Sequence, residues 1–262
     1  LLERGGLDPD DLSARFASRE IFGPGKSMQQ FLHNREQGAA SWYHYGAESA
    51  GNGALMRIAP VVLLHPQGTS AALWLDVALA SIITHRDASS VASCVAFVDL
   101  LARLLRLPAP PTSDWIIGTF TATVRQVCTD QPYRARSGRF TDREGSFPDY
   151  LEFVLDQASR HDWSSREACD AWSSGAYLLE TVPSMLWILA RHAHDGVVGD
   201  PLRRPFVVRL DDHRQRQPQR PGIARAAVLV GRDQTGARRV DPALSQHQLG
   251  EPLVQRHRQH VR

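Results

Sequence analysis

The sequence predicts an all-α fold, in which a compact multi-helix bundle is followed by an irregular basic tail. Apolar residues recur every three or four positions in much of the first 195 residues, which is the spacing of a buried helix face. Helix-capping residues precede several of these stretches, and strand patterns are few. With 262 residues, 42% of them hydrophobic, the chain is long enough to bury a sizeable core.

Six helices are expected in order along the chain. Asp8 and Pro9 begin the first, Thr69 or Ser70 caps the second, and Asp87 caps the third. Ser113 and Asp114 open the fourth helix. The expected ranges are 9–19, 70–84, 88–105, 115–127, 147–160 and 180–192, with Pro183 in the first turn of the last helix.

The segments between and after these helices indicate little sheet. Residues 131–147 are polar and contain Gly138 and Gly145, which predicts a loop. Residues 204–210 and 226–230 are candidate strands, but each is isolated in the sequence. We therefore expect the all-α class rather than a mixed one.

Charge divides the chain into two parts. Residues 201–262 contain 13 Arg, no Lys and five acidic residues, a net charge of +8, whereas the first 200 residues carry −6. Phe206 is the only aromatic residue in that final segment. We therefore predict a helical domain at 1–195 and a tail rich in Arg, Gln and Pro at 196–262 that is disordered or frame-shifted.

Composition excludes several classes of protein. No apolar run approaches the roughly 18 residues that a membrane span needs. The three cysteines fit no zinc or Cys-x-x-Cys spacing, and their odd number argues against a disulfide scaffold, so a reduced cytoplasmic compartment is expected. The chain begins with Leu rather than Met and has no signal-peptide pattern, so we expect it to be truncated at its N-terminus.

The segment from Ser49 to Pro60 has features of an anion-binding site. Gly51-Asn52-Gly53 permits positive φ angles and brings bare backbone N–H groups close to a ligand. We expect a helix to follow at once, so that its positive end faces the same spot. That arrangement suits a phosphate or another anionic oxygen, although a plain helix-start loop has the same pattern.

The longer string identifies a family. Gly51–Pro60 reads GNGALMRIAP and resembles the signature of the ADP-ribosylglycohydrolase family, which includes the dinitrogenase reductase-activating glycohydrolases. Thr84-His85 resembles the family's Thr-His step. Ser174–Pro183 resembles its late Gly-x-x-x-x-Glu-Ser/Thr-x-Pro segment, and Leu1–Asp10 resembles the stretch after its first metal motif. The resemblance covers about residues 1–195.

The resemblance implies a fold and an activity. The fold would be an ADP-ribosylglycohydrolase-like helical bundle, incomplete in this chain. The enzyme would be a hydrolase that cleaves ADP-ribose from a modified acceptor with a pair of Mg²⁺ ions, which orient the substrate while an acidic residue activates water. The partner would be ADP-ribose or an ADP-ribosylated protein. We expect a monomer, with no membrane and no nucleic-acid partner.

The resemblance also implies which residues bind the ligand. The loop would wrap the ribose and phosphates, the next turn would shape the pocket, and the late segment would lie beside the adenine. The implied ligand-binding residues are Ser49, Gly51, Asn52, Gly53, Met56, Arg57, His85, Gly175, Ala176 and Tyr177. Taken alone, His85 also fits a helix-end histidine, Arg57 an ion pair inside the bundle, and Tyr177 a core residue.

The sequence departs from the family at its metal motifs. It contains neither the Thr-Asp-Asp-Thr motif, expected before Leu1, nor the Asp-x-Asp-Thr motif, expected after the 180–192 helix. We therefore assign no metal ligand and no catalytic residue, and expect this chain to be inactive because Mg²⁺ needs several oxygen ligands. A frame-shifted translation from about residue 196 would explain the loss, since Gln215-Arg216-Gln217 lies where the second motif is expected.

Two other functions remain open. An ADP-ribose-binding pseudoenzyme would keep the pocket without the chemistry. A helical scaffold with a basic C-terminal arm would bind nucleic acid through phosphate charge. The arginines of the tail are scattered and lack interleaved aromatic residues, so we favour nucleic acid least.

Overall fold

The computed structural model describes residues 5–18 and 21–194. Its contacts divide the chain into two units, Leu1–Arg204 and Pro205–Arg262. The predicted tail at 196–262, the candidate strands at 204–210 and 226–230, and the first four residues lie outside the described residues. The predicted boundary after residue 195 therefore stays a prediction.

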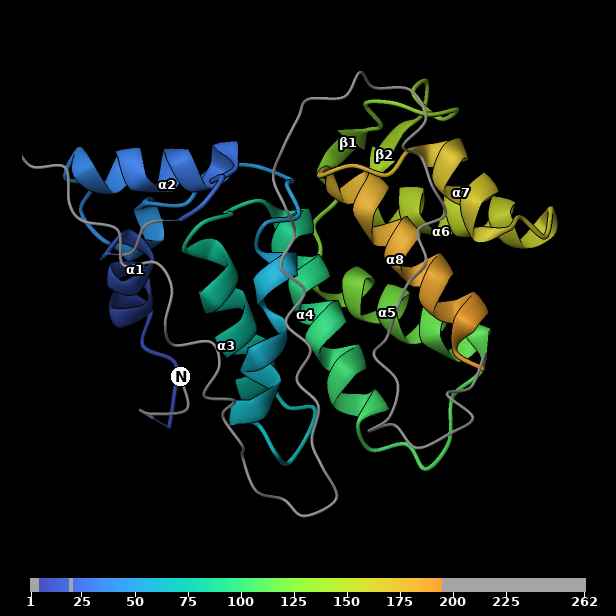
Figure 1. Ribbon diagram of the computed structural model, residues 1–262, viewed down its shortest axis with the longest axis horizontal. Helices are drawn as coiled ribbons and strands as arrows, with labels where there is room; N and C mark the ends of the chain where they lie inside the picture. The colour runs from blue at the N-terminus through green and yellow to red at the C-terminus, as the bar shows by residue number, and fades with distance from the viewer. Residues whose placement is uncertain (1–4, 19–20, 195–262) are drawn as a thin grey trace, which may run out of the picture. The chain divides into compact units, whose positions relative to one another are not determined.

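The all-α prediction is confirmed, because the described part of the chain is mostly helical (Figure 1). Its α-helices are α1 (Pro9–Ser18), α2 (Lys26–Glu36), α3 (Ala71–Ile82), α4 (Ala88–Leu104), α5 (Ser113–Val127), α6 (Phe147–Arg160), α7 (Ser165–Trp172) and α8 (Leu178–His192). Short 3-10 helices are η1 (Trp42–His44), η2 (Leu55–Arg57) and η3 (Ala59–Leu64). Within these residues, no helix is long and apolar enough to cross a membrane.

The predicted caps place several helices correctly. The Ser70 hydroxyl accepts a hydrogen bond from the Leu73 amide at 3.1 Å and begins α3, and Asp87 begins α4 through the Ser90 amide. The fourth predicted helix is capped one residue earlier than expected, by Thr112. Because α8 begins at Leu178 rather than at residue 180, Pro183 lies inside the helix and not in its first turn.

Other elements correct the expectations. The 131–147 segment is not only loop, because β1 (Pro132–Arg134) and β2 (Glu144–Ser146) form a small antiparallel hairpin there. Helices α2 and α7 were not predicted. Helix α2 buries one residue, Phe31, and so lacks an apolar repeat, whereas α7 buries Ala168, Ala171 and Trp172 but has only eight residues, too few to establish a repeat from sequence. The helix expected after Gly53 is absent, and the 3-10 helices η2 and η3 take its place.

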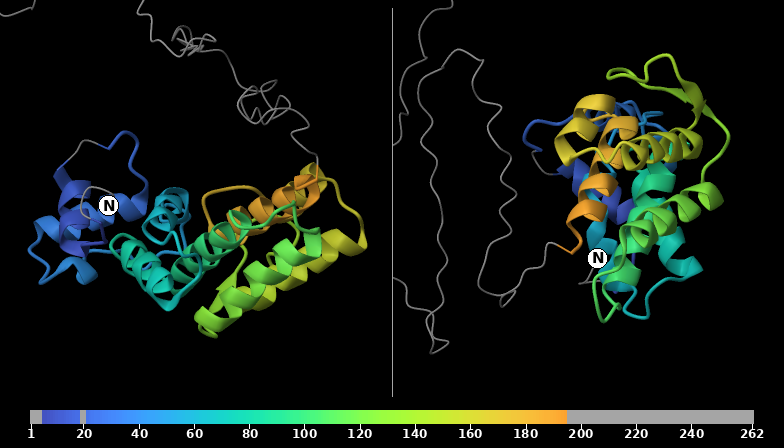
Figure 2. Two further views of the ribbon diagram at one scale, coloured as in Figure 1. Left: turned by 90° about the horizontal axis from the view of Figure 1, so that it is seen from below. Right: turned by 90° about the vertical axis from the view of Figure 1, so that its right-hand side faces the viewer.

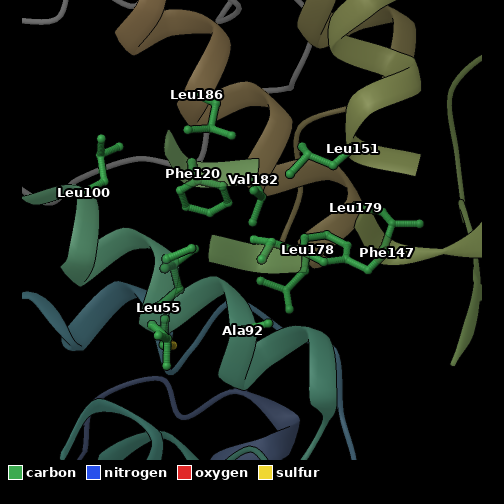
Figure 3. Close-up of a cluster of buried hydrophobic side chains, with 14 of the residues drawn as sticks. Leu55, Ala92, Leu100, Phe120, Phe147, Leu151, Leu178, Leu179, Val182 and Leu186 are labelled. Atoms are coloured by element: carbon green, nitrogen blue, oxygen red, sulfur yellow. The ribbon is translucent and has the colours of Figure 1, made fainter. Parts of the chain in front are cut away.

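The core forms around α4. This helix packs against α3 and η3 and also against α5 and α8 (Figures 1 and 2). Its many small residues let neighbouring helices approach closely, and most of its length is buried. Figure 3 shows Phe120 of α5 beside Val182 and Leu186 of α8 in this core. Helix α8 begins beside the Gly51–Gly53 loop, because the Leu178 amide donates to the Ala50 carbonyl.

Candidate ligand-binding site

A cavity of about 670 Å³ lies where the glycine loop meets the start of α8. Nine of the ten residues implied by the resemblance line it, although they come from three separate parts of the sequence. They are Ser49, Gly51, Asn52, Gly53, Met56, Arg57, His85, Ala176 and Tyr177. Gly175 does not line the cavity. The segment from Ile21 to Met28 forms a further wall that the sequence reasoning missed.

Backbone hydrogen bonds hold the glycine loop against the residues before α8. The Asn52 amide donates to the Ala176 carbonyl, and the Leu178 amide donates to the Ala50 carbonyl, both at 2.9 Å. The Asn52 side chain reinforces this contact, since its Nδ2 donates to Thr181 Oγ1 at 3.0 Å. These bonds use the backbone of the loop in the manner of a short strand pair, so the loop wall has a defined conformation.

The glycines are needed for close approach rather than for positive φ. Neither Gly51 nor Gly53 has a positive φ among the described residues, which corrects the expectation. A Cβ atom on Gly53 would instead lie 2.9 Å from His85 Cε1 and 3.1 Å from His85 Nε2. The positive helix end expected at this loop is also missing, because η2 has only three residues. Positive charge and hydrogen-bond donors in this cavity therefore come from side chains and individual N–H groups.

Arg57 enters the cavity wall from η2. Its Nη2 donates to the Ala80 carbonyl at 3.0 Å and to Thr84 Oγ1 at 2.6 Å, and its guanidinium lies 4.7 Å from the centre of the Phe16 ring. Its Nε is enclosed and has no hydrogen-bond partner. Burial lowers the pKa of Arg57 to about 10, so the side chain remains a cation at neutral pH. The bundle ion pair considered for Arg57 does not occur within residues 5–18 and 21–194.

His85 follows α3 and is only 5% exposed, so it is not a solvated helix-end histidine. Its Nδ1 lies 2.9 Å from Thr84 Oγ1. Its backbone is held by a bridge to Ala47. Burial and the nearby Arg57 charge lower the pKa of His85 to about 4, against an opposing effect of Asp87. The imidazole is therefore neutral at pH 7.

The late segment supplies the opposite wall. Tyr177 is buried, and the Arg136 guanidinium lies 4.1 Å from the centre of its ring, so one ring face already carries a cation. Glu180 is 7% exposed and accepts a hydrogen bond from Ser137 at 2.8 Å. A Cβ atom on Gly175 would meet the Glu180 carboxylate, which would have to move to make room.

The cavity suits an anion better than a metal ion. Lys26, Arg57 and Arg136 line it, whereas Glu180 is the one carboxylate among its described lining residues. No cluster of three or more His, Cys, Asp or Glu side chains that could hold a metal ion exists in the part of the chain that the structure describes. Because Mg²⁺ takes six oxygen ligands in octahedral geometry, these residues do not fit a pair of such ions.

Sequence reasoning missed three charged side chains of the cavity: Lys26, Arg136 and Glu180. Lys26 had a signal, because it is the single lysine of the chain and follows Gly23-Pro24-Gly25. Glu180 lies within the Ser174–Pro183 segment of the resemblance, but the sequence analysis gave it no role in ligand binding. Arg136 lies in a segment rich in arginine, where nothing in the sequence distinguishes it from its neighbours.

Comparison with known proteins agrees with the resemblance. The family model for ADP-ribosylglycohydrolase matches residues 1–234, which is most of the chain. The matched region extends beyond the residues 1–195 covered by the resemblance. Neither the curated proteins nor the solved structures contain a significant match. The family match covers both the glycine loop and the segment before α8, and on this ground the chain belongs to the ADP-ribosylglycohydrolase family.

Proposed function

We propose that this chain binds the ADP-ribose part of an ADP-ribosylated molecule in the cavity between the glycine loop and the start of α8. The family is one of glycohydrolase-type hydrolases, so the substrate class is an ADP-ribose joined to an acceptor. One observation carries the proposal: nine implied ligand residues from three distant segments line a single cavity. Its volume of about 670 Å³ is within the range of cavities that enclose small ligands.

The charges of the cavity support a pyrophosphate. Lys26, Arg57 and Arg136 supply positive charge, and the neutral His85 supplies an N–H donor. Tyr177 would stack on the adenine, with Ala176 beside it. Because Arg136 already covers one face of the Tyr177 ring, the adenine would take the remaining face or displace the guanidinium.

Isothermal titration calorimetry with ADP-ribose tests this assignment. We expect micromolar binding by the full chain and at least a hundredfold weaker binding by Gly53→Val, because any side chain there meets the His85 ring. Gly145→Val is the matched control, since a Cβ atom on Gly145 meets nothing within 4 Å. Equal affinity in wild type and Gly53→Val would reject the cavity as the ADP-ribose site.

Hydrolysis is a separate question from binding. The described residues offer no ligand cluster for the Mg²⁺ pair of the family expectation. We therefore expect negligible release of ADP-ribose from an ADP-ribosylated protein, and ADP-ribose affinity that is the same with Mg²⁺ and with chelator. Binding without turnover would make the chain an ADP-ribose-binding protein. Turnover that depends on Mg²⁺ would contradict our assignment of no metal ligand.

A further inference from the structure

Three side chains form a chain of hydrogen bonds that ends at the cavity. Arg57 Nη2 donates to Thr84 Oγ1 at 2.6 Å, and Thr84 Oγ1 lies 2.9 Å from His85 Nδ1. Thr84 and His85 are both buried, with 0% and 5% exposure. Arg57 is a donor only, so the first bond has a fixed direction.

The direction of the second bond follows from counting protons. A threonine hydroxyl has one proton to donate, and in the described part of the chain Thr84 Oγ1 has no partners besides Arg57 and His85. Since it accepts from Arg57, its own proton is available for His85 Nδ1, and if Nδ1 donated instead, that proton would have no acceptor among the described residues. A neutral imidazole that accepts at Nδ1 carries its proton on Nε2.

The Nε2–H group faces the glycine loop and the cavity. A Cβ atom on Gly53 would lie 3.1 Å from His85 Nε2, and one on Gly51 would lie 3.5 Å from it. No residue among 5–18 and 21–194 accepts a hydrogen bond from this nitrogen. The imidazole therefore presents one unsatisfied donor at the place where a ligand oxygen would lie.

We propose that Arg57 and Thr84 are positioning residues that hold His85 as the neutral Nε2–H tautomer, so that it donates one hydrogen bond to an acceptor oxygen of the bound ligand. The identity of that ligand as ADP-ribose rests on the proposed function, whereas the tautomer does not. Arg57 also disfavours a second positive charge on the adjacent ring, and Asp87 is the charged group that opposes this effect. A hydroxyl between the arginine and the histidine thus fixes both the orientation and the charge of the ring.

The hydrogen-bonded series Arg57–Thr84–His85 is called the relay below. Nitrogen-15 NMR of the full chain labelled at histidine tests the relay without any ligand. His85→Gln identifies the His85 resonances among those of the 11 histidines. We expect a proton on Nε2 and an unprotonated Nδ1 whose shift is displaced by an accepted hydrogen bond. In Thr84→Val that displacement should vanish and the pKa of His85 should rise by about one unit, because a bond to the neutral form is lost.

Matched variants separate the relay from a packing role. Thr84→Ser keeps the hydroxyl and should restore both the Nδ1 shift and the low pKa. Thr121→Val also removes a buried threonine hydroxyl, but that hydroxyl bonds only carbonyls of its own helix, so His85 should not change. If Thr84→Val proves unstable, Thr84→Ala removes the same hydroxyl, and the displacement of the Nδ1 shift should again vanish.

The ligand is tested separately with ADP-ribose. Thr84→Val should bind it about fivefold more weakly than wild type, and Thr84→Ser should not. A wild-type His85 protonated on Nδ1, or a Thr84→Val spectrum equal to wild type, would overturn the relay whatever the affinity. A wild type with the expected spectrum that fails to bind ADP-ribose would support the relay and reject the proposed function.

Discussion

Asp99 and Arg57 are two enclosed charged groups in the same helical unit, and their surroundings differ. Asp99 lies in α4 and is 0% exposed. Its carboxylate accepts from Trp74 Nε1 at 2.9 Å, from Arg103 Nε at 2.8 Å and from Thr123 Oγ1 at 3.3 Å. Both carboxylate oxygens accept hydrogen bonds, so the group is satisfied without a ligand.

Arg57 is only partly satisfied. It donates to a carbonyl and to the Thr84 hydroxyl, its Nε has no partner, and it forms no ion pair with the described residues. A partly buried charge without a counter-charge is costly, and a ligand anion would reduce that cost. The comparison teaches that burial alone does not indicate a ligand-binding residue. The two residues differ because the Asp99 carboxylate has its hydrogen bonds, whereas Arg57 lacks a partner for Nε and a counter-charge among the described residues.

The largest change in the free energy of unfolding is expected when Asp99, whose carboxylate has its hydrogen bonds, is replaced. Asp99→Leu should lower the free energy of unfolding by about 3 kcal/mol, because Trp74 Nε1 loses its acceptor in the core and Arg103 loses its ion pair, whereas Thr123 Oγ1 keeps the Thr119 carbonyl. Urea denaturation measures the change. Asp156→Leu is the control, since Asp156 forms an i,i+4 ion pair with Arg160 on the surface, as Asp99 does with Arg103. This substitution should lower the free energy of unfolding by less than about 0.5 kcal/mol. Similar losses in both variants would contradict a structural role for the Asp99 network.

The next effect is a pH dependence from His85. Its pKa in the folded chain is about 4, below the ordinary value of 6.5, so between these pH values the unfolded chain binds a proton that the folded chain does not. The free energy of unfolding should therefore fall by about 2 to 3 kcal/mol as the pH decreases through this window. Above the window, the stabilisation that comes from the neutral His85 should be fully present. Urea denaturation across that pH range should give a flatter profile for His85→Gln than for wild type. Identical profiles would place the His85 pKa near its ordinary value.

A smaller effect is expected at the wall of the cavity. Thr181 accepts from Asn52 and donates to the Gly175 carbonyl at 2.6 Å, so it joins the glycine loop to α8. Thr181→Val should lower the free energy of unfolding by about 1 kcal/mol, and it should weaken ADP-ribose binding about tenfold because the loop is less well ordered. Calorimetry and urea denaturation of Thr181→Ser, which keeps the hydroxyl, provide the control. Unchanged binding in Thr181→Val would show that the loop keeps its conformation without this bond.

The smallest change in the free energy of unfolding is expected when Arg57, which lacks a partner for Nε, is replaced. Arg57→Met should alter the free energy of unfolding by less than about 1 kcal/mol, because the lost hydrogen bonds are offset by removal of an enclosed charge. The same variant should bind ADP-ribose at least tenfold more weakly. A destabilisation as large as that of Asp99→Leu would remove the distinction between the two groups.

The sequence predicted the elements whose local signals are strong. The range 147–160 matches α6 at both ends, and Asp87 caps α4 as expected. Helix α2 was missed because its sequence, KSMQQFLHNRE, is largely polar and buries only Phe31. The hairpin was missed because its two strands have three residues each and are stabilised by pairing with each other, which a local pattern does not record.

The site was predicted through its motifs but not through its geometry. The resemblance selected nine residues that line one cavity. The reason given for the glycines was wrong, since their backbone angles are ordinary and the proximity of His85 to Gly53 excludes a side chain. The contacts of Arg136 with Tyr177 and of Arg57 with Thr84 join residues far apart in sequence, and such contacts follow from packing alone.

The bond between Asn52 and Thr181 has a consequence for the order of events during synthesis. The two residues are 129 positions apart. At a translation rate of roughly 5 to 20 residues per second, the ribosome makes the second about 6 to 25 seconds after the first. During that interval the glycine loop has no opposite wall. A nascent chain therefore passes through a stage in which α1 to α6 have been made but the cavity does not yet exist.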